Sequence, residues 1–307
     1  MQPQGAESLS CRARWRSLFE TTLRWMEQHV DRFLLGRDPD HVAQLARIKL
    51  LAELALACDL GLMAVAGAAQ EGSLVQAGRL RRLQWLLRHD LGDGQRPASL
   101  MRGDPPPDGV QLSALASLAD ILGRWGAADA WPGPERPRAS DAHPPWIASL
   151  DVVAACRGLG FDDLAREGKS RAAGFPTLPQ NAAYALAHVI MFRTHFGRGP
   201  GLAAAESSLL CAWVPVWQRQ MADAGDVDLL GELTIAARCL GIRDDPFDVA
   251  EVIQQSQEAD GAVVGLHEAH VAAEAGAGVA CTWFKRRYHT TVVANVAASF
   301  SVGDLRE

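Results

Sequence analysis

The amino-acid sequence predicts an all-α protein. Apolar residues recur at three- and four-residue steps through most of the chain, which is the spacing of one helix face. Strand signals are nearly absent, and the best of them, Val263-Val264, is too short to form a sheet. Several helical segments close in Leu-Gly, at Leu60-Gly61, Leu122-Gly123, Leu159-Gly160 and Leu240-Gly241. We therefore expect antiparallel helix pairs, arranged as an α/α toroid or as an orthogonal helical bundle.

Three helices are expected in the first part of the chain. The first carries an apolar stripe from Trp15 to Phe33 and ends near Gly36. The second runs from about Asp40 to Leu60-Gly61, where the glycine can supply a left-handed C-terminal cap. The third covers roughly Leu74 to Leu91. These helices hold most of the large apolar side chains of the N-terminal part.

Two stretches rich in Gly and Pro, 92–109 and 129–145, are predicted loops. The remaining helices are expected at 112–125, 147–159, 180–197, 202–223, 226–240, 246–258 and 284–300. A Gly/Ala-rich loop is expected before the last of them. We expect one helical domain over 1–307, whose natural subdivision is 1–128 and 146–307, the second part carrying the candidate site.

Composition excludes several classes of protein. The 48% hydrophobic content suffices for a large core, and the net charge of −6 argues against nucleic-acid binding. Arg79, Arg81, Arg82 and Arg88 lie at helical spacing and are interpreted as a solvated face. No secretory leader and no uncharged apolar segment of membrane-spanning length is recognisable, so we expect a cytoplasmic protein without a membrane partner.

Cofactor and metal motifs are also missing from the sequence. No P-loop, GxGxxG, GxSxG or HExxH occurs, so no cofactor is expected. His267-x-x-His270 lies in the Gly/Ala-rich loop without a recognisable third ligand, and we expect no metal there. The six cysteines are widely spaced, without a CxxC, and are interpreted as reduced core residues. Asp244-Asp245 precedes Pro246 and is interpreted as a helix boundary.

The most distinctive segment contains Tyr184, His188 and Phe192. Their four-residue spacing places all three on one face of a helix with apolar neighbours. An imidazole in that setting is neutral or partnered, and either state suits proton transfer, although a hydrogen-bonded core histidine fits the same pattern. Arg193 near the helix end can bind an anionic substrate group or complement the helix dipole.

A carboxylate pair follows in Asp228 and Glu232, one helical turn apart. Directed into a cavity, such a pair can supply a base or bind a cation. The alternative is that Asp226 or Asp228 caps the helix and that the first-turn acids stabilise its positive end. Glu232 fits this alternative less well, because it stands within an otherwise apolar helix, as Glu53 does.

The third cluster is Arg287-Tyr288-His289-Thr290, at the expected start of the last helix. Cations, a hydroxyl and backbone N–H groups at a helix start attract phosphate, sulfate or carboxylate. We expect Arg287, His289 and Thr290 to bind an anionic or leaving group of the substrate and Tyr288 to orient it, with His289 and Tyr288 counted among the catalytic residues. A plain polar helix start, with Thr290 or Thr291 as the cap, is the alternative.

These segments together resemble an uncharacterised actinobacterial all-α family whose members appear near natural-product biosynthetic genes. The resemblance covers residues 180–300 and includes the Tyr184–Phe192 run, the Asp228/Glu232 helix, the Gln257…Asp260-Gly261 turn and the Tyr288-His-Thr-Thr segment. At His195 that family usually has an aspartate, so no role carries over to His195. The layout is also similar to the toroids of terpene cyclases and prenyltransferases.

Two classes of function therefore stand beside each other. The first is an enzyme of secondary metabolism that catalyses cyclisation or elimination of a small polar substrate. It would act alone or as the helical subunit of a two-component enzyme. His188 or Glu232 would be the base, and closure of an aziridine with loss of sulfate is one fitting reaction. The second is a non-catalytic helical module for a carrier protein, peptide or pathway partner. A terpene-cyclase-like enzyme, which needs an aromatic-lined cavity, is a third hypothesis.

Overall fold

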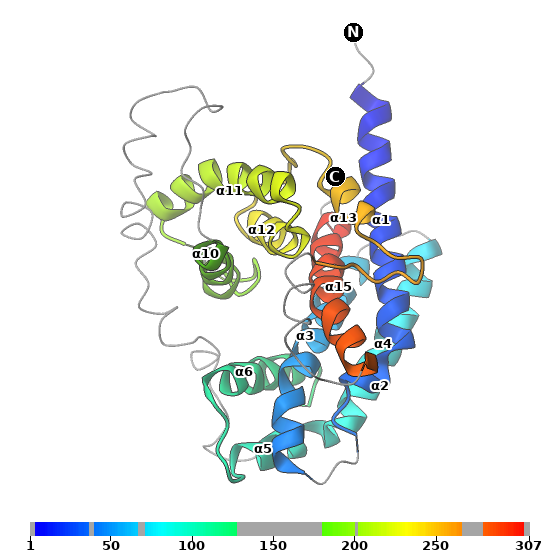
Figure 1. Cartoon of the computed structure of the whole chain (residues 1–307), viewed down its shortest axis with the longest axis vertical. Helices are drawn as coiled ribbons and strands as arrows, with labels where there is room; N and C mark the ends of the chain where they lie inside the picture. Colours follow the sequence, from blue (N-terminus) through cyan, green and yellow to red (C-terminus); the bar gives the residue numbers. More distant parts are fainter. Residues whose placement is uncertain are drawn as a thin grey trace. The chain divides into compact units, whose positions relative to one another are not determined.

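The computed structural model describes residues 4–36, 40–66, 71–127, 180–199, 202–265 and 279–303. Within these ranges every regular element is a helix, and the only β feature is an isolated bridge between Gln257 and Val263 (Figure 1). The predicted all-α class is thus confirmed. The helix expected at 147–159, the loop expected at 129–145, and His267 and His270 lie outside the described residues.

The chain folds as two compact units. Unit 1 consists of residues 1–144 and 250–307, and unit 2 consists of residues 145–249. Unit 1 is therefore discontinuous in sequence, with unit 2 inserted between its two parts. The subdivision expected from the sequence placed 146–307 together, whereas the last helices in fact join the N-terminal ones.

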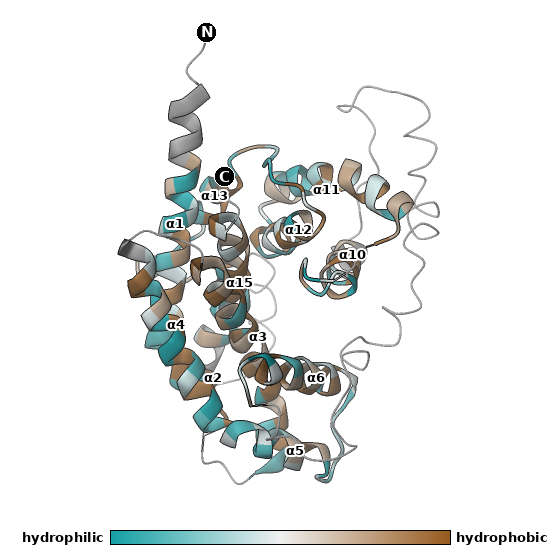
Figure 2. Ribbon diagram, turned by 180° about the vertical axis from the view of Figure 1, so that it is seen from behind, coloured by the Kyte–Doolittle hydropathy of each residue, from teal (hydrophilic) through white to brown (hydrophobic). Residues whose placement is uncertain are grey.

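The helices of unit 1 are mostly long. They are α1 (Gln4–Gln28), α2 (Val30–Phe33), α3 (His41–Ala66), α4 (Glu71–Asp90), α5 (Gln95–Met101), α6 (Gly109–Arg124), α13 (Val249–Gln255) and α15 (Val279–Gly303). α3 packs against α4, α6 and α15, and α1 packs along α15 (Figure 1). With helices on several of its sides, α3 is the centre of a helical bundle. Figure 2 shows α15 mainly in hydrophobic colours, as expected for an inner helix.

A buried polar contact fixes α15 against α1. Asn295 donates from Nδ2 to Thr22 Oγ1 at 2.9 Å and to the Phe19 carbonyl at 3.2 Å. The surrounding contacts are apolar, with the Trp25 ring stacked on Phe284 at 5.7 Å between centroids. Because a buried amide is costly without partners, this contact favours a single alignment of the two helices.

Two predictions for unit 1 were wrong for clear physical reasons. Gly61 does not end a helix but lies inside α3, where an added Cβ would come within 3.1 Å of Leu80 on α4. The glycine therefore permits close helix packing rather than a left-handed cap. The loop predicted at 92–109 contains α5, whose Pro97 lies in the first helical turn, where a missing N–H costs nothing.

Unit 2 contains α10 (Gln180–Arg193), α11 (Ala204–Ala224) and α12 (Val227–Cys239). α12 packs against both α10 and α11 and is buried from Val227 to Ala237. Asp226 caps it, since its carboxylate accepts a hydrogen bond from the Leu229 N–H at 3.1 Å. Of the two acids considered as caps, Asp226 has this role, which leaves Asp228 to face another helix.

None of the described helices combines the length and the apolar character needed to cross a membrane. Four cysteines have described side chains, and all four are free thiols: Cys11, Cys58, Cys211 and Cys239. Burial raises the pKa of Cys239 to about 12 and that of Cys58 still further, so both are protonated at neutral pH. Cys58 lies in the core as predicted from the sequence, whereas Cys11, Cys211 and Cys239 are only partly buried.

Candidate functional site

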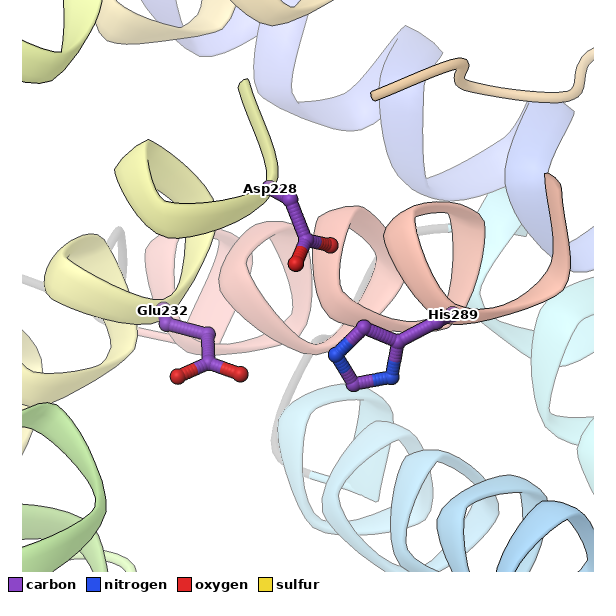
Figure 3. Close-up of side chains that lie close together, drawn as sticks. All are labelled: Asp228, Glu232 and His289. Carbon is purple, nitrogen blue, oxygen red and sulfur yellow. The ribbon is translucent and has the colours of Figure 1, made fainter. Parts of the chain in front are cut away.

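Unit 2 pairs the polar residues of α10 with those of α12. The Tyr184 hydroxyl donates to Asp228 Oδ2 at 2.7 Å. One turn further along both helices, His188 Nε2 lies 3.2 Å from Oε1 and 3.1 Å from Oε2 of Glu232. The two contacts advance in the same direction, so α10 and α12 run parallel where they meet. Figure 3 shows Asp228 and Glu232 leaving the same side of α12.

The histidine and the carboxylate of this pair differ in exposure. The Glu232 side chain is 3% exposed, whereas that of His188 is 36% exposed. Accepting from Nε2–H, the carboxylate fixes the imidazole tautomer in which Nδ1 carries the lone pair. The rings of Tyr184 and Phe192 flank the imidazole at 6.4 and 6.0 Å between centroids. A half-exposed imidazole oriented by a buried carboxylate is a suitable proton acceptor.

Tyr184 acts as a neutral hydrogen-bond donor in this cluster. Burial raises the pKa of Tyr184, and the negative charge and hydrogen bond of Asp228 raise it further. The phenol therefore keeps its proton far above its usual titration range. This fixes the direction of the contact, from the phenol O–H to the carboxylate.

Arg193, expected to bind a substrate anion, forms an ion pair in the structure. Its guanidinium lies 3.0 Å from Glu206 Oε1, and Glu206 Oε2 also accepts from the Ala203 N–H at the start of α11. Arg193 thereby connects the end of α10 to the start of α11. His195 follows α10 with a positive φ of 47° and is exposed.

Unit 1 contains a second histidine–carboxylate pair. His289, which projects from α15 (Figure 3), has Nδ1 at 3.2 Å from Glu53 Oε2 on α3. Lys49 Nζ lies 3.5 Å from the other oxygen of Glu53, Oε1. Burial alone would raise the pKa of Glu53, but His289 and Lys49 outweigh it and hold that pKa below its usual range.

Tyr288 and Arg287 flank this second pair on α15. The Tyr288 ring stacks on Phe284 at 5.6 Å and meets the His289 ring at 6.1 Å. Arg287 forms a two-pronged ion pair with Glu258, at 2.7 and 2.8 Å, and lies over the Trp283 ring. In this structure Arg287 therefore ties α15 to the segment after α13.

The expected helix start at Arg287 was wrong. α15 begins at Val279, so residues 287–290 lie inside the helix and their N–H groups face its own carbonyls. Thr290 is buried mid-helix, and its hydroxyl has no hydrogen-bond partner among the described residues. Thr291 Oγ1 accepts from the Val263 N–H at 2.9 Å, so neither threonine caps a helix. The anion-binding helix start predicted there does not exist.

Sequence reasoning missed two members of these pairs. These are Glu53 and the neighbouring Lys49, and their four-residue spacing on one helix face is the sequence signal that indicates their contact. Of the residues assigned to the site, Tyr184, His188, Asp228 and Glu232 are brought together in unit 2. The imidazole and carboxylate groups of either pair are also possible ligands for Zn²⁺ or Mn²⁺. The expected absence of a metal and a cofactor therefore stays a prediction.

Fold and contacts together define an all-α protein in which each of two units carries a histidine–carboxylate pair. The chain belongs to the family described as Domain of unknown function (DUF6895), whose model matches residues 19–299. Both pairs lie within the matched range. No curated protein and no solved structure matches the chain.

Proposed function

We propose that this protein is an enzyme, acting alone or as the helical subunit of a two-component enzyme, in which His188 is the general base. Its reaction would be cyclisation or elimination on a small polar substrate that carries an amine and a leaving group. The contact of His188 Nε2 with both oxygens of buried Glu232 is the observation that carries this proposal.

The pair supports base catalysis for electrostatic reasons. When the imidazole accepts a proton at Nδ1, it becomes a cation next to the Glu232 carboxylate. Because Glu232 is buried, little water screens the attraction between them, which favours the protonated product of the transfer. Tyr184 and Asp228 hold the adjacent turn of α10 against α12 and so position the imidazole.

The chemistry can be written as a balanced step. His188 Nδ1 takes a proton from the substrate amine, and the nitrogen lone pair forms a bond to the carbon bearing the leaving group. The bond from that carbon to the leaving group breaks, and the leaving group departs with the electron pair. Closure of an aziridine with loss of sulfate is one such reaction.

Other assigned residues have supporting roles in this proposal. His289 with Glu53 is a second pair able to accept a proton, with Tyr288 beside it. Arg193 and Arg287 are held by Glu206 and Glu258, so either can bind a substrate anion only by exchanging its carboxylate partner. We therefore place the base, rather than an anion site, at the centre of the proposal.

The biological setting rests on the resemblance of residues 180–300 to proteins encoded near natural-product genes. A role in antibiotic or other secondary metabolism, a cytoplasmic location and a carrier-protein-bound substrate are part of the proposal for that reason. A terpene-cyclase-like enzyme needs an aromatic-lined cavity, and the pocket of about 200 Å³ beside α4 has no aromatic residue in its lining.

The test is substrate discovery with a base variant. Purified wild-type protein, with any partner that co-purifies from the native producer, is incubated with small-molecule extracts of that producer. Mass spectrometry should show one compound consumed and a product that is lighter by the acid of the leaving group. His188→Gln should lower the rate of this conversion by about 10²–10⁴-fold, and Glu232→Gln should weaken it.

The matched control is His195→Asn, which removes another imidazole of unit 2. Asparagine tolerates the left-handed backbone found there, so the control should fold and convert substrate normally. If wild-type and His188→Gln proteins gave the same conversion, His188 would be a structural residue. The helical interaction module would then be the better description of the protein.

A further inference from the structure

The outward side of α4 gathers exposed apolar and basic side chains. At 3.6 residues per turn its exposed residues fall within a sector of about 120°, opposite the buried leucines Leu80, Leu83 and Leu87. We call this the α4 outer face, and it consists of Leu74, Val75, Gly78, Arg81, Arg82, Trp85 and His89. Figure 2 shows hydrophobic and hydrophilic colours alternating along α4.

The apolar members of this face are unusually exposed. Leu74 is 77% exposed and Trp85 is 62% exposed, the two largest values among the exposed large hydrophobic side chains of the described residues. His89 stacks on Trp85 with ring centroids 5.4 Å apart and an interplanar angle of 2°. A preformed stack of two exposed rings offers a flat contact surface at little further entropic cost.

The arginines of α4 divide into two kinds. Arg79 pairs with Glu27 and Arg88 pairs with Asp93. Arg81 and Arg82, which lie on the outer face, form no ion pair within the described part of the chain. On a chain with net charge −6, this face therefore combines uncompensated positive charge with exposed apolar rings.

A pocket adjoins one edge of the face. It measures about 200 Å³ and is lined by Glu27, Gln28, Val30, Arg82, Leu83 and Leu86. Arg82 belongs to both the pocket and the face, so the two form one continuous surface. Val30, Leu83 and Leu86 form the apolar part of its lining, which can contact a single aliphatic side chain of a partner.

We propose that the α4 outer face docks a separate protein through an acidic amphipathic helix. The stretch from Leu74 to Trp85 is about 16 Å long, which matches roughly three turns of a partner helix. Acidic side chains of that helix would pair with Arg81 and Arg82, and its apolar side chains would cover Leu74 and Trp85. This inference is independent of the proposed base catalysis.

Charge and composition favour an acidic protein over other partners. Nucleic acid is bound through many clustered cations, whereas this face offers two unpaired arginines beside large apolar side chains. Arg and Trp are the residues most enriched at the centres of protein interfaces. Nucleic acid, an anionic membrane and a second copy of this chain are the alternatives that the experiment must separate.

The test uses fluorescein-labelled synthetic helices three turns long, with two leucines on one face and glutamates beside them. Fluorescence anisotropy should show binding to the wild-type protein that weakens as salt is added. Arg81→Glu with Arg82→Glu should weaken binding at least about tenfold, and Trp85→Ala by a similar factor. Peptides with lysine in place of glutamate should bind the charge-reversed protein better than the wild type.

The control is Arg12→Glu with Arg16→Glu, two exposed arginines on α1. This variant has the same net charge as the α4 variant and should bind the acidic peptides as the wild type does. Equal weakening by both variants, or no binding by the wild type, would overturn the proposal. So would Arg81-dependent binding of an oligonucleotide or an anionic vesicle in place of the peptides, or Arg81-dependent self-association in sedimentation.

Discussion

In unit 2 His188 lies within hydrogen-bonding distance of both oxygens of Glu232, whereas in unit 1 Glu53 divides its oxygens between His289 and Lys49. The exposures differ as well. Glu232 is almost fully buried beside a half-exposed histidine, while Glu53 and His289 are both about one-fifth exposed. The same two residue types are thus embedded in different charge environments.

The difference shows how a neighbouring cation changes the electrostatic interaction within a histidine–carboxylate pair. Lys49 already compensates part of the Glu53 charge, so Glu53 gains less from a proton placed on His289. In unit 2, both oxygens of the buried Glu232 carboxylate lie within 3.2 Å of His188 Nε2. We therefore propose the unit 2 pair as the base, and this expectation can be tested by treating the pairs separately.

The largest expected effect is on turnover. His188→Gln should lower the rate of product formation by about 10²–10⁴-fold, the usual contribution of a general base. His289→Gln should lower it by less than about tenfold, because Lys49 still compensates Glu53. Rates measured for both variants with the same substrate decide between the pairs. A larger loss for His289→Gln would place the base in unit 1.

The next effect concerns the stability of unit 2. Tyr184→Phe leaves the buried Asp228 carboxylate without its phenol donor and should lower the free energy of unfolding by about 1–3 kcal/mol. Urea denaturation of this variant, of Asp228→Asn and of the double variant forms a mutant cycle. Strictly additive losses would show that the two side chains do not interact.

A smaller effect should be visible in the ionisation of the phenol itself. The chain has two tyrosines, so Tyr288→Phe leaves Tyr184 as the only source of tyrosinate absorbance. Because the pKa of Tyr184 is raised in the folded state, the unfolded state ionises first and stability falls as pH rises above about 10. An alkaline spectrophotometric titration should show tyrosinate only as the protein unfolds. Ionisation near pH 10 with the fold intact would contradict the buried contact.

The smallest effect is that of the unit 1 pair on stability. The lowered pKa of Glu53 means that its carboxylate stabilises the fold above its unfolded pKa of about 4.3 and loses this effect as pH falls through the folded pKa. Glu53→Gln should therefore cost about 1 kcal/mol at pH 7 and almost nothing near pH 3. Urea denaturation at both pH values measures the difference. Lys49→Met removes one of the two cations beside Glu53. It should therefore also lower the free energy of unfolding more at pH 7 than near pH 3, by a smaller amount than Glu53→Gln does.

Spacing within a helix was the part of the site that sequence could predict. Four-residue steps correctly indicated that Tyr184 and His188 share one face and that Asp228 and Glu232 share another. That these two faces contact each other depends on α10 and α12 running side by side in the same direction, although α11 lies between them in the sequence. Local periodicity carries no information on that arrangement.

Errors in helix boundaries had local physical causes. The segment before Trp283 was predicted as a loop because of its Gly and Ala content, yet α15 already begins at Val279. Gly61 was interpreted as a helix end, but its lack of a side chain serves the contact with Leu80. In both cases the local composition is compatible with a helix and with a loop or helix end. The packing of the folded chain decides between the two.

The position of α15 has a consequence for how the chain matures on the ribosome. α15 packs on α1 and α3, but roughly 200 residues are synthesised between the end of α3 and the start of α15. At about 5–20 residues per second this leaves an interval of roughly 10–40 s. During it, Trp25 and its apolar neighbours lack the cover of Phe284 and Trp283. The side of α1 that α15 covers therefore stays without that helix until α15 has emerged from the ribosome.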